Sequence, residues 1–366
     1  MQKHKVRVLV VDDSAIARDL IERGLSLDQE IEVIGKASDA FSARDKIVLL
    51  NPDVITLDIE MPRMDGIEFL KRLLPQYPIP VVVVSAVTVE GSRRALEAME
   101  AGALDIVAKP DASNRDGLTL MLAELAEKVK EAATADIVKL RRFQSDAHAE
   151  AKASQSRGTH ALGTLSAIGG NRIIAIGAST GGTTALNTLI PQFPADMPGV
   201  VLVQHMPAVF TRLFADALNK ISKVSVKEAV SGDIVRAGLV LVAPGDFHMT
   251  VHKHGLEWRV DCNPGEKVSG HRPSVDVLFN SVAEAAGSKA VGLILTGMGR
   301  DGADGLLAMR RAGGRALAQN EESSVVFGMP KAAWENGAAE RLVSIEDAVP
   351  GILSCLEASA QKRTLP

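Results

Sequence analysis

The sequence has little cysteine and no excess of basic charge. Its two cysteines, Cys262 and Cys355, are far apart among 366 residues and lack the CxxC spacing of zinc or redox sites. This argues against a disulfide framework, so we expect a cytoplasmic protein. The 41 lysines and arginines are outnumbered by 45 aspartates and glutamates. We therefore expect no nucleic-acid partner, and no helix-turn-helix signal supports one.

Long hydrophobic runs are also missing. The N-terminal apolar run "VRVLVV" meets two aspartates after six residues, far short of the roughly 20 residues that a membrane helix needs. We expect no signal peptide and no membrane insertion. A chain of 366 residues exceeds the usual size of one hydrophobic core, which predicts two domains.

The first part of the chain alternates short, β-branched apolar runs with helical periods. This alternation predicts a flavodoxin-like, five-stranded parallel sheet with helices on both faces. A further amphipathic helix over about 117–134 completes a predicted domain at 1–134. The expected strands are 6–11, 31–37, 54–58, 81–85 and 105–109.

The composition then changes and the alternation later resumes. Residues 144–170 are rich in Ala, Ser, Gly and His with no sustained period, which predicts an interdomain linker at 135–170. Residues 171–366 are expected to form a second domain, doubly wound and mostly parallel α/β. Its expected strands are 172–177, 199–205, 239–245, 290–297 and 314–320.

Five polar residues follow or end strands of the first sheet, at its carboxyl edge, where open parallel sheets bind ligands. Clustered carboxylates favour a hard cation such as Mg²⁺. One carboxylate, Asp58, could then attack a phosphoryl donor, with a lysine neutralising the phosphate oxygens. Any one of these residues alone would more often be a turn former. The five are Asp12, Asp13, Asp58, Ser85 and Lys109.

The stretches "VLVVDDS", "DVITLDIEMPRMDG", "VVVVSA" and "DIVAKP" resemble a two-component response-regulator receiver domain over about residues 5–130. The resemblance implies that Asp58 is the phosphoacceptor and that a histidine kinase is the phosphodonor. It also implies Ser85 as the switch hydroxyl, Lys109 as the conserved-type lysine of the family, and a Mg²⁺ site formed by Asp12, Asp13, Asp58 and the backbone carbonyl of Glu60. Ile106 departs from the family, which often has an aromatic there. That departure favours a readout through the fourth strand and the helix after it.

The stretch "GASTGG" at 177–182 joins an apolar run to a helical period. It lacks the second glycine of a dinucleotide fingerprint and the lysine of a Walker loop. It fits G-x-S-x-G, in which a strained turn exposes a serine nucleophile. From these letters alone, Ser179 is either a nucleophile or part of an ordinary glycine turn.

A serine nucleophile needs a histidine base and a carboxylate that orients it. Of the eight histidines, His205 ends an apolar strand and points to the same edge as Ser179, although a buried structural histidine is the alternative reading. His248 could line the cleft, and His271 could contact substrate. His252 and His254 belong to an expected hairpin tip.

The expected acid is Asp301, in the glycine-rich loop "TGMGRDGADG" after another apolar strand. Asp304 competes with it, but its place in the following helix favours a capping role. The glycines make the loop backbone approachable, so the Met298 amide is the expected donor to an oxyanion. The chain order Ser, His, Asp differs from that of the α/β hydrolases.

The stretches "IGASTGG", "VQHMP", "TGMGRDGA", "RPSVDVLF" and "VVFGMPKAA" resemble the chemotaxis-specific protein-glutamate methylesterases, which are receivers fused to a methylesterase domain. The resemblance implies a phosphorylation-regulated hydrolase that demethylates glutamate γ-methyl esters, releasing methanol, and deamidates certain glutamines on methyl-accepting chemotaxis receptors for sensory adaptation. It implies Ser179, His205 and Asp301 as catalytic residues, with Thr180 hydrogen-bonded in the site. No cofactor is expected for the ester reaction, and we expect a monomer. The alternative is a receiver with a non-catalytic, partner-binding output domain.

Overall fold

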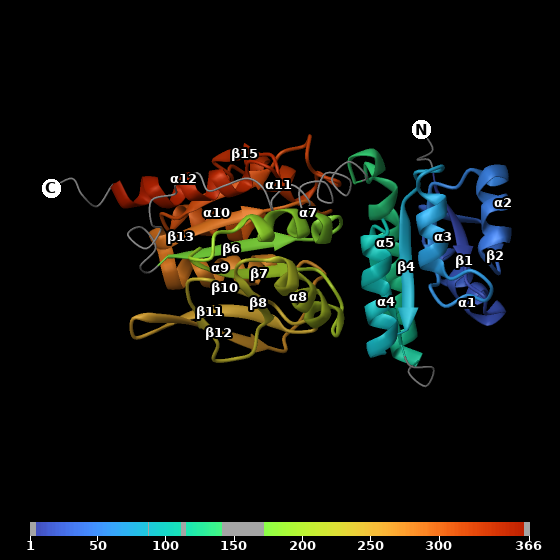
Figure 1. Ribbon diagram of the computed structural model, residues 1–366, viewed down its shortest axis with the longest axis horizontal. Helices are drawn as coiled ribbons and strands as arrows, with labels where there is room; N and C mark the ends of the chain where they lie inside the picture. Colours follow the sequence, from blue (N-terminus) through green and yellow to red (C-terminus); the bar gives the residue numbers. More distant parts are fainter. Residues whose placement is uncertain (1–4, 87, 111–114, 141–171, 362–366) are drawn as a thin grey trace. The chain divides into compact units, whose positions relative to one another are not determined.

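The computed structural model describes residues 5–86, 88–110, 115–140 and 172–361 (Figure 1). The chain divides into two compact units, Met1–Arg141 and Arg142–Pro366. Of the predicted linker, residues 135–140 lie in the first unit, where Leu140 is buried. The rest of the predicted linker lies outside the described residues.

The first unit contains a five-stranded parallel sheet in the order β2-β1-β3-β4-β5. The helices form two contacting groups, α1 with α5, and α3 with both α2 and α4. The strands are β1 (Val6–Val11), β2 (Ile31–Ala37), β3 (Val54–Leu57), β4 (Val81–Ala86) and β5 (Asp105–Lys109). The helices are α1 (Ala15–Leu25), α2 (Ala40–Leu50), α3 (Gly66–Leu73), α4 (Val89–Glu100) and α5 (Arg115–Ala133).

Local sequence explains where these helices begin. Four of them start at a side chain that accepts a hydrogen bond from an amide of the first turn, which stabilises a helix N-terminus. These residues are Ser14, Asp39, Asp65 and Thr88. The central strands β1, β3 and β4 are mostly buried Val, Ile and Leu, whereas the edge strand β2 is only partly buried. The predicted five-stranded parallel sheet is confirmed.

The second unit is built on a seven-stranded parallel sheet in the order β15-β14-β13-β6-β7-β10-β8. Its strands are β6 (Ile173–Ala178), β7 (Gly199–Gln204), β8 (Ser225–Glu228), β10 (Leu239–Val242), β13 (Ala290–Ile294), β14 (Arg315–Gln319) and β15 (Arg341–Val343). Its helices are α7 (Gly182–Leu189), α8 (Phe210–Ile221), α9 (Val275–Ala286), α10 (Ala303–Arg311), α11 (Met329–Glu335) and α12 (Ala348–Gln361), with short 3₁₀ turns η2 (Ile190–Gln192) and η3 (Gly287–Lys289).

A separate antiparallel sheet, β11-β12-β9, also belongs to this unit. It consists of β9 (Ile234–Val235), β11 (His248–His254) and β12 (Glu257–Asn263), and β11 packs against α9. The expected hairpin tip is confirmed, since His254 pairs with Glu257 across the turn. The sequence did not predict this sheet, β8 or β15. β9 and β15 are very short, and β8, "SVKE", has only one fully buried residue.

β6 lies at the point where the strand order of the large sheet reverses. The chain continues from β6 to β7, β8 and β10 on one side and returns to β13, β14 and β15 on the other. Open α/β sheets bind ligands at the carboxyl edge of such a reversal. The loops after β6, β7 and β13 meet at this edge, and these loops carry Ser179, His205 and Asp301.

Candidate active site and phosphorylation site

Ser179 lies in a tight turn between the end of β6 and the start of α7. Gly181 in this turn has a φ of 78°, a left-handed conformation that glycine adopts without strain. A Cβ atom at Gly181 would lie 2.7 Å from Cβ of Val325. Ser179 is only 3% exposed. The turn is the strand-to-helix elbow that the glycine spacing predicts.

His205 is the neighbour of Ser179 on the adjacent strand. Ala178 pairs with Gln204 where β6 and β7 run parallel, so the next residue of each strand is again opposite the other. The His205 amide donates to the Ala178 carbonyl over 3.1 Å, and Nε2 of Gln204 donates to the Ser179 carbonyl over 3.0 Å. Gln204 therefore fixes the elbow to the strand that ends at the histidine.

His205 and Asp301 are joined by a hydrogen bond of 2.8 Å between Nε2 and Oδ2. Both residues are buried, at 6% and 2% exposure. An ionised carboxylate only accepts, so Nε2 carries the proton and Nδ1 has its lone pair. Within the described residues, Nδ1 of His205 has no hydrogen-bond partner, and no hydrogen bond joins His205 to the Ser179 hydroxyl. The imidazole thus lies at the end of the strand next to the elbow, with Nδ1 unpartnered among the described residues.

Asp301 receives three further hydrogen bonds from the N-terminus of α9. The hydroxyl of Ser274 and the amide of Asp276 donate to Oδ1 over 2.8 and 3.0 Å, and the Val275 amide donates to Oδ2 over 2.7 Å. Burial opposes ionisation of Asp301, but the hydrogen bond and charge of His205 and these α9 amides outweigh it. The pKa of Asp301 is therefore lowered to about 2. At neutral pH this carboxylate is ionised and fixed in place.

Asp276 was not singled out from the sequence. It is 8% exposed, and its Oδ1 accepts from the Gly305 amide, in the first turn of α10, over 2.7 Å. Burial raises the pKa of Asp276 to about 6, the Gly305 amide opposes this, and the neighbouring charges of Asp301 and Asp304 add to it. In the sequence, the signal for Asp276 is its place two residues after Ser274, as an acid near the expected start of a helix.

The competing histidines and acid have other environments. Nδ1 of His248 accepts from the Ser274 amide over 3.2 Å and Nε2 lies 2.8 Å from the Glu266 carbonyl, so both ring nitrogens are engaged by backbone. The His271 ring stacks on that of His205, with centroids 3.8 Å apart. Asp304 pairs with Arg300 on the surface, while Asp276 holds the Gly305 amide of the same helix. The expected capping role of Asp304 thus belongs to Asp276.

The loop after β13 passes directly against the elbow. A Cβ atom at Gly297 would lie 2.7 Å from Cβ of Ser179, so only glycine permits this approach. Met298, the expected oxyanion donor, is the next residue and is half-buried. Thr180 is buried, and its carbonyl accepts from the hydroxyl of Thr296 over 3.0 Å.

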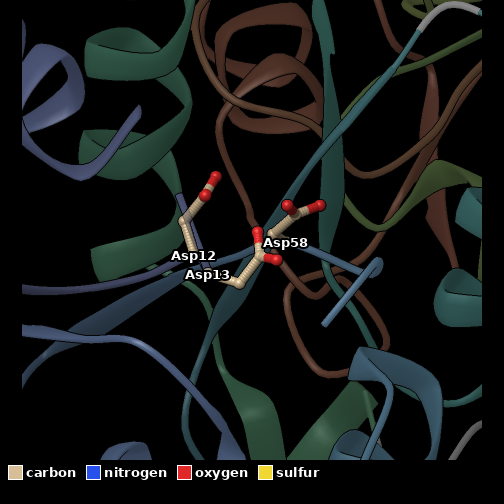
Figure 2. Close-up of side chains that lie close together, drawn as sticks. All are labelled: Asp12, Asp13 and Asp58. Atoms are coloured by element: carbon tan, nitrogen blue, oxygen red, sulfur yellow. The ribbon is translucent and has the colours of Figure 1, made fainter. Parts of the chain in front are cut away.

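The first unit has its own cluster at the carboxyl edge, shown in Figure 2. Ligand oxygens of Asp12, Asp13 and Asp58 all lie within 4.8 Å of one another. Nζ of Lys109 lies 2.8 Å from Asp12 Oδ2 and 2.9 Å from Asp58 Oδ2. Burial raises the pKa of Asp58. The positive charge of Lys109 opposes this rise, and the negative charge of Asp12 adds to it. Three carboxylates with one ammonium form an all-oxygen site that could bind Mg²⁺.

Of the remaining predicted residues, Ser85 lies near the end of β4 and Glu60 in the loop after β3. The Ser85 hydroxyl, which is buried, donates to the Gly91 carbonyl at the start of α4 over 3.2 Å. The Glu60 amide donates to Oδ1 of Asp58 over 3.3 Å. Ile106 is 1% exposed and packs in the core.

None of the described helices combines the length and apolar character that crossing a bilayer requires.

The fold and the two sites define a class of protein: a receiver-like domain followed by an α/β domain with serine, histidine and aspartate at one sheet edge. Comparison with known families agrees. The response regulator receiver domain model matches residues 8–122, and the CheB methylesterase model matches residues 174–352. Together with the full-length relatives described next, these matches show that the chain belongs to the CheB methylesterase family.

Two relatives are similar over nearly the whole chain, and both are named protein-glutamate methylesterase/protein-glutamine glutaminase. The protein of Syntrophotalea carbinolica is 53% identical over 96% of this chain and 98% of its own length. That of Sulfurimonas denitrificans is 52% identical over 95% and 99%. Among solved structures, the Thermotoga maritima CheB methylesterase catalytic domain is 38% identical over 51% of this chain and 98% of that one, with a TM-score of 0.49.

Proposed function

We propose that this protein is a phosphorylation-regulated protein-glutamate methylesterase and protein-glutamine deamidase that acts on methyl-accepting chemotaxis receptors. The observation that carries the proposal is the hydrogen bond between His205 and Asp301, which leaves Nδ1 of His205 buried and without a hydrogen-bond partner among the described residues, at the end of the strand next to that of Ser179. The family membership of the chain supports the same chemistry. The proposed setting is the cytoplasm, with the protein acting as a monomer.

The ester reaction follows from the positions of the three side chains. Oγ of Ser179 attacks the ester carbonyl while its proton passes to Nδ1 of His205. Asp301 holds the ring through Nε2 and stabilises the imidazolium. The tetrahedral intermediate collapses as the methoxy group takes the proton and leaves as methanol. Water then attacks the acyl-serine by the same proton path and releases the glutamate. A glutamine amide would lose ammonia in the equivalent step.

The developing oxyanion needs a donor on the far side of the carbonyl from His205. The loop after β13 lies against Ser179 through Gly297, so the Met298 amide is our proposed donor. No hydrogen bond joins the Ser179 hydroxyl to His205 within the described residues, and we expect one to form when substrate binds, because hydrogen bonds of a catalytic site often tighten only then. Ser179, His205 and Asp301 are the proposed catalytic residues.

The first unit is the proposed regulator. The Asp58 carboxylate attacks the phosphoryl group of a phosphohistidine on a histidine kinase, and Lys109 faces the phosphoryl oxygens. Asp12, Asp13, Asp58 and the Glu60 carbonyl are the proposed Mg²⁺ ligands, and Ser85 the hydroxyl that responds to the phosphoryl group. Bound Mg²⁺ would neutralise phosphoryl charge as the transfer occurs.

The test is release of methanol from membranes that carry methyl-labelled receptors of the same cell, with and without a small phosphodonor. We expect the wild-type protein to release methanol and the phosphodonor to increase the rate. Ser179→Ala should lower the rate of methanol release by about 10³-fold or more, while Asp58 still becomes phosphorylated. Asp58→Asn should keep the basal rate and lose the increase. Hydrolysis retained in Ser179→Ala would remove the serine from the mechanism.

A further inference from the structure

We propose that Asp276 is a positioning residue of the esterase site, which locks the Asp301 loop against α9 so that Asp301 meets His205. The inference rests on the proposed function, because it assigns a role within that reaction. It starts from a reciprocal arrangement of two helix N-termini. Asp301 precedes α10 but accepts from the N-terminus of α9, and Asp276 begins α9 but accepts from the N-terminus of α10.

The Asp301 carboxylate depends almost entirely on this arrangement. Of the four hydrogen bonds that it accepts from described residues, three come from residues 274–276 and the fourth comes from His205. Oδ2 is shared between the Val275 amide and the histidine, at 2.7 and 2.8 Å. A small displacement of α9 against the Asp301 loop would therefore change the direction in which Oδ2 faces the imidazole.

The contact that prevents such a displacement is the hydrogen bond from the Gly305 amide to Asp276. Gly305 follows Asp301 by one helical turn, so the bond closes a short ring from Asp301 through α10 to Asp276 and back. The helices touch backbone to backbone at this point. A Cβ atom at Gly305 would lie 2.9 Å from the Asp276 carbonyl and 2.7 Å from Cβ of Phe279. No side chain at 305 separates the two helices.

A carboxylate at 276 is unfavourable for the folded state by itself. It is buried beside the ionised Asp301, with Asp304 also near. An ordinary helix cap is usually exposed and has no second acid in contact. The residue is therefore better explained by the acceptor atom that it brings to Gly305 than by the charge that it brings to the site.

The test compares Asp276→Ala, which removes the acceptor, with Asp276→Asn, which keeps an oxygen in the same place. Methanol release from methyl-labelled receptor membranes is measured at pH 7.5 in the absence of phosphodonor. We expect Asp276→Ala to lower kcat by about 10 to 100-fold, the usual consequence of misplacing a catalytic group by about 1 Å. KM should change less than twofold, and Asp276→Asn should restore most of kcat.

Two matched controls separate positioning from general loss of stability. Asp304→Ala removes the acid in the first turn of α10, which is exposed and pairs with Arg300, and should leave kcat unchanged. Asn219→Ala removes one side-chain acceptor for the Val226 amide, elsewhere in the same unit, and should lower Tm without lowering kcat. If Asp276→Ala does not fold, Asp276→Ser, with a shorter acceptor, takes its place.

Two outcomes would overturn the inference. Asp276→Ala could lose no more activity than Asn219→Ala at an equal fall in Tm, which would make Asp276 a structural cap only. Asp276→Asn could lose as much kcat as Asp276→Ala, which would assign the effect to charge instead of geometry. Failure of the proposed function looks different, because hydrolysis would then survive in Ser179→Ala whatever stands at 276.

Discussion

The imidazole of His271 lies flat on that of His205, with ring centroids 3.8 Å apart and planes inclined by 12°. His271 is held there by paired backbone hydrogen bonds with Val268, of 2.9 and 3.1 Å. The sequence suggested that His271 contacts substrate. That contact stays a prediction, and the structure places the His271 ring flat on that of the proposed base.

This stacking predicts a difference between two substitutions of His271. His271→Phe keeps a flat ring on His205, whereas His271→Ala leaves the imidazole free to tilt away from Ser179. We expect kcat for methanol release to fall about tenfold in His271→Ala and to remain within about threefold of wild type in His271→Phe. His252→Ala, on the β11 strand, serves as the control and should have no effect. Equal losses in the Phe and Ala variants would show that the nitrogen atoms of His271 matter, not its plane.

The pKa values of Asp301 and Asp276 predict how the stability of the fold depends on pH. Asp301, with a pKa lowered to about 2, stabilises the fold above its unfolded value of 3.8, and this contribution is lost as the pH falls towards 2. Asp276, with a pKa raised to about 6, does the reverse. Its contribution is complete below pH 3.8 and is lost as the pH rises through 6.

Between pH 4.5 and 7.5 the effect of Asp276 should be the visible one. Denaturant unfolding of wild type and Asp276→Asn at both pH values measures it. The variant should gain about 2 kcal/mol relative to wild type as the pH rises from 4.5 to 7.5. A difference between the two proteins that is independent of pH would mean that Asp276 is not protonated in this range.

Lys109 predicts that the free energy of unfolding of the first unit also depends on pH. Lys109→Ala leaves Asp12 and Asp58, both buried, beside each other without a cation. We expect the free energy of unfolding of the first unit to fall by about 3 kcal/mol at pH 7, with a smaller loss near pH 4, where carboxyl groups take up protons. Added Mg²⁺ should restore part of it.

Lys36 offers the matched control for this measurement, because it pairs with Asp19 and Glu22 in solvent. Lys36→Ala should change stability little, since exposed ion pairs contribute little. If Lys109→Ala were equally mild, the carboxylates would be solvated more than their burial indicates.

The turn at Ser179 predicts that alanine lowers the stability of the fold by different amounts at two glycines of left-handed conformation. Gly181 and Gly255 have φ values of 78° and 62°. A Cβ atom at Gly181 meets Val325 at 2.7 Å, whereas one at Gly255 meets nothing within 4 Å. Gly255→Ala should therefore cost only the backbone term, about 1 kcal/mol, and Gly181→Ala about 2 to 4 kcal/mol. Thermal unfolding measures both, and equal values would mean that the elbow tolerates the added methyl group.

Much of the fold follows from short-range patterns. Runs such as "VVVVSA" and "RIIAIG" specify buried parallel strands, and the residues at their carboxyl ends meet because all parallel strands end at the same edge. This is why Asp12, Asp58 and Lys109 could be grouped before their contacts were known. The same reasoning brought Ser179 and His205 together.

What the sequence did not reveal depends on contacts between distant segments. Asp276 and Asp301 are 25 residues apart, and only the docking of α9 on the α10 loop gives each acid its partners. The tautomer of His205 likewise follows from which ring nitrogen faces Asp301. β8 and β9 were missed because they are short or polar. β11 and β12 alternate apolar with polar residues, a weaker signal than the continuous apolar runs of the buried parallel strands.

The crossed helix N-termini also bear on synthesis of the chain. Ser179 and His205 are made long before residues 301–305, and the acid that completes the site has its partners only after α10 has joined α9. A nascent or truncated chain that ends before α10 would present the serine and the imidazole without a working acid. The proposed site is therefore complete only after α10 has been translated and packed against α9.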